Sequence, residues 1–508
     1  MKRLLERPGL VFLLVFIWKV SLLLTTAQPI PANDSFFYDG PVVHFLNHGG
    51  YFNPAIAQTH PISGTEVFSA YPPLYQFVLL AWMSLFGTGV LSAIWFHTLL
   101  FGGFLLTVLA IFRQLKVPPR CANLAGLFLL AITFDDRPDG LACLLGIIGV
   151  YFWARSRNEP GAIHWPWLAA IFSVLTFCVS LQIGALFSFW VFLAFLAGWK
   201  TSRAPLPFGP LAAMILLPAA LVAIVHFGFP RLWAGFLENL HGNASLSGWH
   251  MPDFGQLLKV GRNIPVIFCM TALLVTIGSR HLPEVKTWSA GKILFACGLL
   301  VALMFAFACL FVVAANWVIV DNYLQPILAG LFLAALEKYR PDFFRSRVVT
   351  ICVVLLAGLV AVRAVGMSTW GVACATDVNC AAALQRVGSE LDSVPPKSNV
   401  LLSAAYLYEA DRHTNGVWIH EDYPLRREPL ETYPQSLRRL HVSKLLLTQY
   451  DYYRRYQRVL DELRAGGGVQ ITVTDTAHVR TPDSYPRFQQ VVQHVSWAPI
   501  IIDLKWEN

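Results

Sequence analysis

The first 366 residues of the chain alternate between long apolar runs and short polar stretches. Most of the runs extend over roughly 15 to 25 residues, which is about the length that a helix needs to cross the hydrocarbon core of a bilayer. The pattern therefore predicts eleven membrane-spanning helices. They lie near residues 9–27, 91–112, 121–134, 140–154, 165–181, 183–199, 207–228, 264–278, 293–314, 323–337 and 348–366.

The pattern changes after residue 366, where short strand-like runs alternate with helical stretches. The predicted strands cover 399–404, 442–448, 469–474 and 499–504, and the predicted helices lie near 378–393 and 451–465. Gly466-Gly467-Gly468 is expected to end the second of these helices. This order predicts a small α/β domain over 367–508, attached to a polytopic α-helical membrane module over 1–366.

Composition and charge agree with a membrane protein. Of the 508 residues, 56% are hydrophobic and 13% are charged, whereas about 25% are charged in an ordinary soluble domain. The charged residues are also unevenly distributed, since 31 of the 68 Lys, Arg, Asp and Glu follow residue 366. We therefore exclude a soluble enzyme, a nucleic-acid-binding protein and a disordered tail.

The basic residues predict the orientation in the membrane. If the N-terminus is cytoplasmic, 17 of the 23 Lys and Arg in the first 366 residues lie in inward-facing segments, as the positive-inside rule requires. An odd number of spans then places 367–508 on the extracytoplasmic side. We therefore predict that the chain lies in the inner membrane of a cell and crosses it many times.

One apolar stretch, residues 71–87, is not counted as a span, because counting it would move every later basic cluster outside. It is rich in Tyr, Trp and Phe and is expected to form a helix at the outer interface, within a long outer loop over 28–90. The first apolar run has a second interpretation as a cleaved signal peptide, which would leave the rest of the topology unchanged. Lys19 interrupts this run and is expected either to face a partner or wet cavity, or to extend toward the interface.

Acidic residues gather on the predicted outer face in two motifs. Asn33-Asp-Ser-Phe-Phe-Tyr-Asp-Gly40 follows the first span, and Phe134-Asp-Asp-Arg-Pro-Asp-Gly140 is a short loop between two spans. The second motif places Asp139 at the start of a helix, where a negative charge suits the helix dipole. Spans one, three and four are expected to bring Asp34 and Asp139 to one opening. The alternative is that these acids only cap helices in contact with water.

The motifs resemble those of C-type glycosyltransferases, with the bacterial aminoarabinose transferases and the protein O-mannosyltransferases as the nearest patterns. Asp34, Tyr38 and Gly49 match the register of an Asp, a Tyr four residues later and a Gly about fifteen residues after the Asp. Asp39 does not match it. Tyr71-Pro-Pro-Leu-Tyr75, Arg137-Pro-Asp-Gly140 and Tyr323-Leu-Gln-Pro326 resemble three further family motifs. The sequence departs from the family at three places. Relatives carry Glu at the position of Ser35 and Lys or His at the position of Tyr71. They carry a basic residue before the Tyr323 motif, where this chain has Asp321-Asn322.

The resemblance implies transfer of a sugar from a polyprenyl phosphate in the membrane to a hydroxyl of a glycan, lipid or protein acceptor, with inversion. Such a reaction needs a carboxylate to take the proton of the acceptor and groups to hold the phosphate. Asp34 is the candidate base, and partial desolvation at the interface is expected to raise its basicity. Asp139 is expected to orient the acceptor or to share a divalent cation. The residues expected to contact substrates are Tyr38, Tyr71, Tyr75, Arg137, Lys259, Arg262, Asp321 and Tyr323.

Several alternatives stay open at the level of sequence. His44 and His48 are four residues apart and share a helix face, but the sequence places no third metal ligand beside them, so no metal site is assigned. Cys374 and Cys380 lie in an extracytoplasmic segment where a disulfide is permitted. A polytopic transporter or lipid flippase is the alternative function. It would favour paired charges at mid-membrane and a repeated half, but the spans are almost free of charge apart from Lys19, and no repeat is found. A non-catalytic scaffold is a third interpretation.

Overall fold

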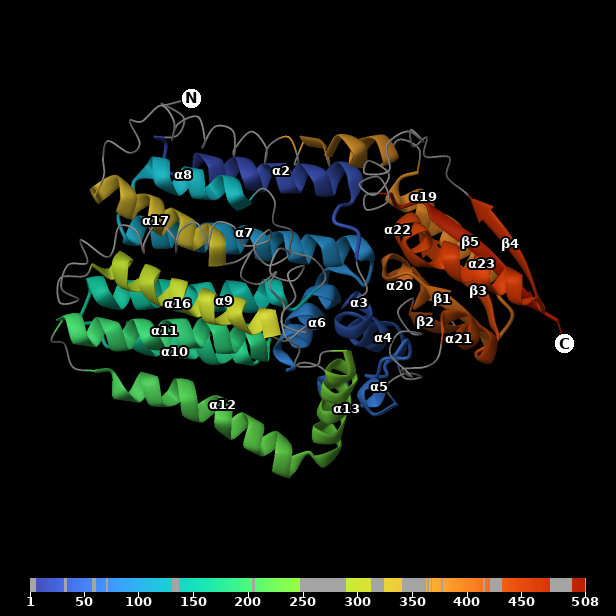
Figure 1. Ribbon diagram of the computed structural model, residues 1–508, viewed down its shortest axis with the longest axis horizontal. Helices are drawn as coiled ribbons and strands as arrows, with labels where there is room; N and C mark the ends of the chain where they lie inside the picture. The colour runs from blue at the N-terminus through green and yellow to red at the C-terminus, as the bar shows by residue number, and fades with distance from the viewer. Residues whose placement is uncertain are drawn as a thin grey trace.

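The computed structural model (Figure 1) describes most of the chain. The residues described are 6–31, 34–56, 61–69, 72–129, 137–202, 206–246, 289–311, 324–339, 362, 365–366, 368–375, 378–413, 416–420, 432–475 and 496–507.

Long apolar helices lie side by side and form a bundle (Figure 1). Nine of the predicted spans coincide with helices of this bundle. These are α2 (Leu10–Thr26), α7 (Val90–Gln114), α8 (Pro119–Phe128), α9 (Asp139–Asn158), α10 (His164–Phe177), α11 (Leu181–Ser202), α12 (Phe208–Gly228), α16 (Ala290–Phe311) and α17 (Gln325–Tyr339). The predicted span 264–278 lies outside the described residues, as does most of 348–366.

Three helices in the described part of the chain are long and apolar enough to cross a membrane, namely those over Val90–Gln114, Leu181–Thr201 and Phe208–Gly228. The helix α12 exposes Phe208, Leu216 and Phe227, as expected of a helix surrounded by lipid. The structure therefore supports a membrane protein, while the number of eleven spans stays a prediction.

Contacts join neighbouring helices at both ends of the bundle. At one end of the bundle, Arg157 Nη1 donates a hydrogen bond to the carbonyl oxygen of Gly198 over 3.1 Å, and Arg120 pairs with Glu337. At the opposite end, the backbone N–H of Leu74 donates to the carbonyl oxygen of Cys178 over 3.1 Å. The predicted topology puts the first group inside and the second outside. Helices that run in alternate directions produce this grouping.

The segment between α2 and α7 forms short helices at the predicted outer end. They are α3 (Asp34–Tyr38), α4 (Gly40–His48), α5 (Pro61–Thr65), the 3₁₀ helix η1 (Val67–Ser69) and α6 (Leu74–Phe86). With 13 residues, α6 is about 20 Å long. It belongs with α2 and α10 among the shorter apolar helices, and that residues 71–87 do not form a span stays a prediction. The helix α13 (Pro230–Leu246) contacts α5 and η1.

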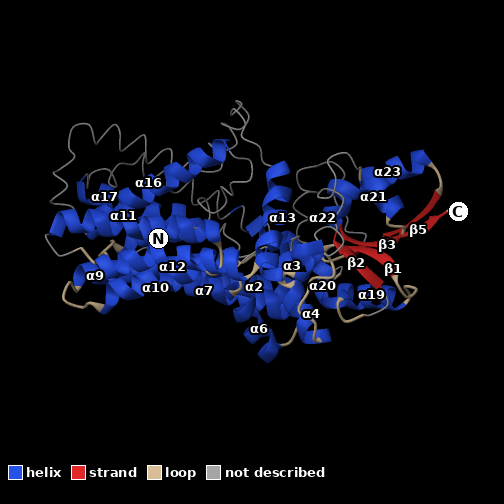
Figure 2. Ribbon diagram, turned by 90° about the horizontal axis from the view of Figure 1, so that it is seen from below, coloured by secondary structure: helices blue, strands red, loops and turns tan. Residues whose placement is uncertain are grey.

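The C-terminal residues form a five-stranded sheet at the same end of the bundle as these short helices (Figures 1 and 2). The strands are β1 (Ser398–Leu402), β2 (Gly416–His420), β3 (Val442–Thr448), β4 (Val469–Asp475) and β5 (Pro499–Trp506), in the order β2-β1-β3-β5-β4. The pairs β1–β2 and β1–β3 are parallel, whereas β3–β5 and β4–β5 are antiparallel. Four strands coincide with predicted ones, and β2 was not predicted.

Helices cover both faces of this sheet, with α19 (Cys380–Asp392) on one side and α21 (Tyr433–Arg439) and α23 (Gln457–Gly466) on the other (Figure 2). The short helices α20 (Leu407–Ala410) and α22 (Gln449–Asp451) and the π-helical turn Tyr452–Tyr456 complete the unit. The left-handed backbone of Gly467 and Gly468, with φ of 65° and 75°, follows α23, as the predicted glycine stop requires.

The two faces of the sheet belong to different hydrophobic cores, because neighbouring residues of a strand point to opposite faces. Leu401 and Leu445 pack with α21 and α23 in a separate cluster. Leu402 and Leu446 belong to a cluster that continues into the membrane helices. The indole Nε1 of buried Trp497 donates to the carbonyl oxygen of Thr26, at the end of α2, over 3.1 Å. The C-terminal unit is thus packed directly onto the bundle.

Candidate active site

A guanidinium group connects the two carboxylates that the sequence singled out. Arg137 Nη1 lies 3.2 Å from Asp34 Oδ2, and Arg137 Nε lies 3.0 Å from Asp139 Oδ2. Asp34 begins α3, shortly after the first predicted span, and Asp139 begins α9, the fourth. The two acidic motifs therefore meet at one place, although their carboxylates lie 105 positions apart in the sequence.

Local sequence explains how Asp139 and Arg137 are placed. Pro138 precedes the first residue of α9, and proline is favoured at helix starts because its fixed φ suits the first turn. Asp139 lies in the first turn of this 20-residue helix, where the helix dipole stabilises a negative charge. Arg137 precedes the helix and is thereby free to turn its side chain toward α3.

The three side chains differ in their access to solvent, and this difference separates their roles. The side chain of Asp139 is 7% exposed, while those of Asp34 and Arg137 are 30% and 28% exposed. A buried carboxylate is costly unless a positive partner accompanies it, and Arg137 supplies that partner. Asp34 is consequently the carboxylate that an incoming substrate can reach more readily.

The position of Arg137 also bears on whether a divalent cation binds between Asp34 and Asp139, a question that the sequence left open. The guanidinium contacts both carboxylates and carries the positive charge that a divalent cation would otherwise supply. A cation shared by Asp34 and Asp139 would have to displace it. In the arrangement observed, Arg137 holds the two carboxylates together, and the trio carries one net negative charge when all three groups are ionised.

The acid Asp39 occupies a different environment from that of Asp34, five residues earlier. It is fully buried and accepts hydrogen bonds from the hydroxyls of Tyr75, over 2.7 Å, and Tyr408, over 2.6 Å. Burial raises the pKa of Asp39 to about 7, although both hydrogen bonds act in the opposite direction. Because Tyr408 belongs to α20, Asp39 connects the outer loop to the C-terminal unit rather than facing solvent.

Tyr38 and Tyr75 lie in the interior beside Asp39. Tyr75 is 1% exposed, and the ring of Tyr38 meets it edge to face with 6.4 Å between centroids. The hydroxyl of Tyr75 also lies 3.2 Å from His97 Nε2. Since the one hydroxyl proton of Tyr75 goes to Asp39, His97 acts as the donor in this second contact. Both tyrosines are buried, and the Tyr75 hydroxyl points inward to Asp39 and His97.

The remaining candidate substrate contacts lie outside the described residues. These are Tyr71, Lys259, Arg262, Asp321 and Tyr323. Their roles stay predictions.

Two other sequence-based questions have structural answers. Lys19 Nζ lies 5.9 Å from the centre of the Phe101 ring, within the range of a cation–π contact, so an aromatic partner faces this charge inside α2. Cys380 is a buried thiol at the start of α19. The disulfide between Cys374 and Cys380 that the sequence permits is therefore not formed in this structure.

Sequence reasoning missed several residues that the structure brings together. Asp39 stood in the acidic motif but was set aside because it fell out of register with the family. Its partner Tyr408 and the buried acid Asp411 carry no local signal, since each meets the outer loop from more than 360 positions away. Such pairs follow from the way the C-terminal unit packs on the bundle, and they can be recognised only when this packing is known.

Comparisons with known proteins give similar folds at low identity. The chain is similar to the structure of ArnT from Cupriavidus metallidurans bound to undecaprenyl phosphate, with 13% identity, a TM-score of 0.49 and coverage of 97% of this chain and 98% of that one. It is also similar to the oligosaccharyltransferase from Archaeoglobus fulgidus in complex with zinc and sulfate. Here the identity is 12% and the TM-score 0.43, with coverage of 88% of this chain and 69% of that one.

No family model matches the sequence. No curated protein matches it either. Both structural neighbours are C-type glycosyltransferases, in agreement with the resemblance that the motifs indicated. Because the TM-scores are below 0.5, the activity has to be argued from the geometry of the site.

Proposed function

We propose that the chain is a membrane glycosyltransferase that moves a sugar from a polyprenyl-phosphate donor to an acceptor hydroxyl on the extracytoplasmic face. The observation that carries the proposal is the shared contact of Arg137 with Asp34 and Asp139. Carboxylates held at the outer end of a membrane bundle are costly to desolvate, which favours a functional role over a purely structural one.

In the proposed reaction Asp34 is the general base. The acceptor oxygen attacks the anomeric carbon while its proton passes to the Asp34 carboxylate. The bond between this carbon and the phosphate oxygen breaks, and its electron pair leaves with the polyprenyl phosphate. Because phosphate is a stable anion, the leaving group needs little protonation. A single displacement from the opposite side inverts the anomeric centre.

Arg137 and Asp139 position the base. The ion pair with Arg137 fixes Asp34 Oδ2, so that Oδ1 is the oxygen assigned to the acceptor proton. Asp139 anchors Arg137 at the start of the rigid helix α9. Preorganised charges of this kind account for much of the rate enhancement of many enzymes.

Binding of the donor phosphate is assigned to groups predicted from the sequence. A guanidinium has five N–H donors, so Arg137 can serve a phosphate alongside the carboxylates. Lys259 and Arg262 are assigned to the same phosphate, while Tyr71, Asp321 and Tyr323 are assigned to the substrates. Tyr75 supports the site by a hydrogen bond to Asp39, and Tyr38 supports it by packing against Tyr75.

The proposal is tested with purified full-length protein and a polyprenyl-phosphate sugar labelled in the sugar. We expect label in a new product whose anomeric configuration is opposite to that of the donor. Retained configuration would contradict the single displacement. Movement of an unchanged solute across vesicles, without a new product, would contradict the enzyme and favour the transporter or flippase.

A further inference from the structure

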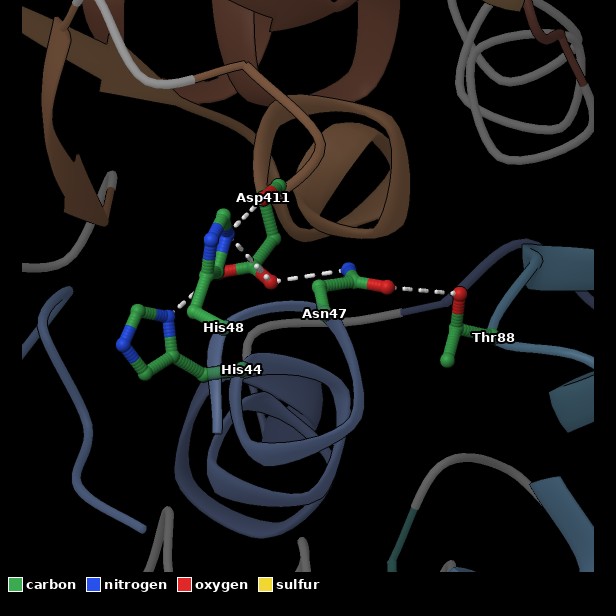
Figure 3. Close-up of polar contacts among 5 residues, drawn as sticks. All are labelled: His44, Asn47, His48, Thr88 and Asp411. Carbon is green, nitrogen blue, oxygen red and sulfur yellow. Dashed lines mark hydrogen bonds and ion pairs between the residues drawn. The ribbon is translucent and has the colours of Figure 1, made fainter. Parts of the chain in front are cut away.

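Two histidines and a buried carboxylate converge where the outer loop meets the C-terminal unit (Figure 3). His44 and His48 belong to α4, and Asp411 directly follows α20. The coordinating atoms of these three residues all lie within 4.8 Å of one another. The cluster is distinct from the pair Asp34 and Asp139, because it uses a different helix and a residue of the C-terminal unit.

The contacts within the cluster are close. His44 Nδ1 lies 2.9 Å from Asp411 Oδ1, and His48 Nε2 lies 3.5 Å from Asp411 Oδ2. His48 Nε2 also contacts the carbonyl oxygen of Asp411. The two imidazole rings lie 4.8 Å apart between centroids, since residues four apart share one face of a helix. That spacing lets both rings point at one partner (Figure 3).

We propose that His44, His48 and Asp411 bind a zinc ion that fastens the outer loop to the C-terminal unit. Zinc prefers nitrogen and oxygen ligands of this kind, and two imidazoles with one carboxylate leave its fourth position for water. The ligand atoms would be His44 Nδ1, His48 Nε2 and Asp411 Oδ1. A coordinating imidazole nitrogen carries no proton, so in the zinc-bound site neutral His44 holds its proton on Nε2 and neutral His48 holds its proton on Nδ1.

The geometry needs only a small adjustment to hold the ion. Zinc–ligand bonds of about 2.1 Å in a tetrahedron place the ligand atoms about 3.4 Å apart. The separation of 2.9 Å between His44 Nδ1 and Asp411 Oδ1 is close to this value, and His48 Nε2 lies 3.5 Å from the other carboxylate oxygen, Oδ2. The wider separation, of up to 4.8 Å, closes by rotation of His48, whose side chain is 28% exposed.

A second layer of contacts holds the carboxylate in place for this role. Asn47 Nδ2 donates to Asp411 Oδ2 over 2.9 Å, and Thr88 Oγ1 donates to Asn47 Oδ1 over 3.1 Å (Figure 3). Such outer contacts orient metal ligands. The Asp411 side chain is only 3% exposed, so a buried negative charge gains from a cation at this point.

The experiment measures zinc in the full-length protein, purified in detergent through a tag without histidine. The protein is stripped with a chelator, reloaded with zinc and assayed for tightly bound metal. We expect wild type to retain about one zinc ion more than either His48→Ala or Asp411→Asn. Both variants should bind zinc at least about 100-fold more weakly than wild type, and Asn47→Ala should bind it roughly 10- to 100-fold more weakly. Cobalt in the same site should give the visible absorption of a tetrahedral ion.

His413→Ala is the matched control, because His413 also pairs with carboxylates, Asp392 at 2.9 Å and Glu409 at 3.7 Å. It should keep the zinc content of wild type. Equal zinc content in wild type and Asp411→Asn would overturn the proposal. So would a wild-type protein that retains no zinc, which makes the test independent of how well the variants fold. Sugar transfer is not needed for either result.

Discussion

Asp39→Asn should change how the stability of the protein depends on pH. The carboxyl of Asp39 is fully buried between the hydroxyls of Tyr75 and Tyr408, and burial raises its pKa to about 7. In the unfolded chain the same group titrates near its ordinary value of about 4. The substitution removes this titration while the amide still offers groups for contact with both hydroxyls.

The sign of the effect follows from proton binding. Between about pH 4 and pH 7, folded Asp39 keeps a proton that the unfolded chain has released. The free energy of unfolding therefore decreases as the pH rises through this range and becomes constant above it. The full difference between the two pKa values corresponds to about 4 kcal/mol. Groups other than Asp39 titrate in both proteins, so the comparison between wild type and variant isolates its contribution.

The assay is thermal unfolding of the detergent-solubilised protein from about pH 5 to about pH 8. Wild type should lose stability relative to Asp39→Asn across this range, with the largest change below about pH 7. Parallel curves for the two proteins would refute the reasoning, because they would show that Asp39 binds no additional proton in the folded state.

Three further changes test other contacts. Arg137→Lys should lower sugar transfer about 100-fold, because a single ammonium cannot bridge both carboxylates as the planar guanidinium does; the initial rate measures it, and a wild-type rate would contradict the bridging role. Tyr408→Phe should destabilise attachment of the C-terminal unit by about 1.5–3 kcal/mol, since a hydrogen bond to the buried Asp39 is lost; unchanged resistance to limited proteolysis would argue against it. Glu337→Gln, at the opposite end of the bundle, should cost at most about 1 kcal/mol, because its partner Arg120 is half exposed. It should also leave transfer intact, and a lost activity would contradict the placement of the site.

The sequence predicted the helices well, because long apolar runs leave few alternatives inside a bilayer. Nine predicted spans coincide with helices, and α6 forms within the stretch 71–87 where a helix was expected. The meeting of Asp34 and Asp139 was also predicted, from motifs at the same ends of alternating spans. The strand β2, Gly-Val-Trp-Ile-His, was missed, since it begins with glycine, which is depleted in strands, and its apolar residues are consecutive and show no period-two alternation.

Contacts between the outer loop and the C-terminal unit were beyond the reach of sequence reasoning. His44 and His48 were recognised as neighbours on a helix, but Asp411 comes from more than 360 positions away. The inward direction of the Tyr75 hydroxyl follows from the same packing. Local patterns place side chains on an element, whereas the partners that they face depend on tertiary structure.

The most direct test of the proposed site compares Asp34→Asn with Glu66→Gln. Both acids lie in the outer loop and pair with an arginine, at 3.2 Å for Asp34 and 3.4 Å for Glu66, and their side chains are 30% and 29% exposed. The measurement is the initial rate of sugar transfer from a labelled polyprenyl-phosphate donor by the purified, folded proteins. Loss of a general base should slow Asp34→Asn by about 10²- to 10⁴-fold, while Glu66→Gln keeps the wild-type rate. Transfer by Asp34→Asn at the wild-type rate would contradict the assignment of Asp34 as the base.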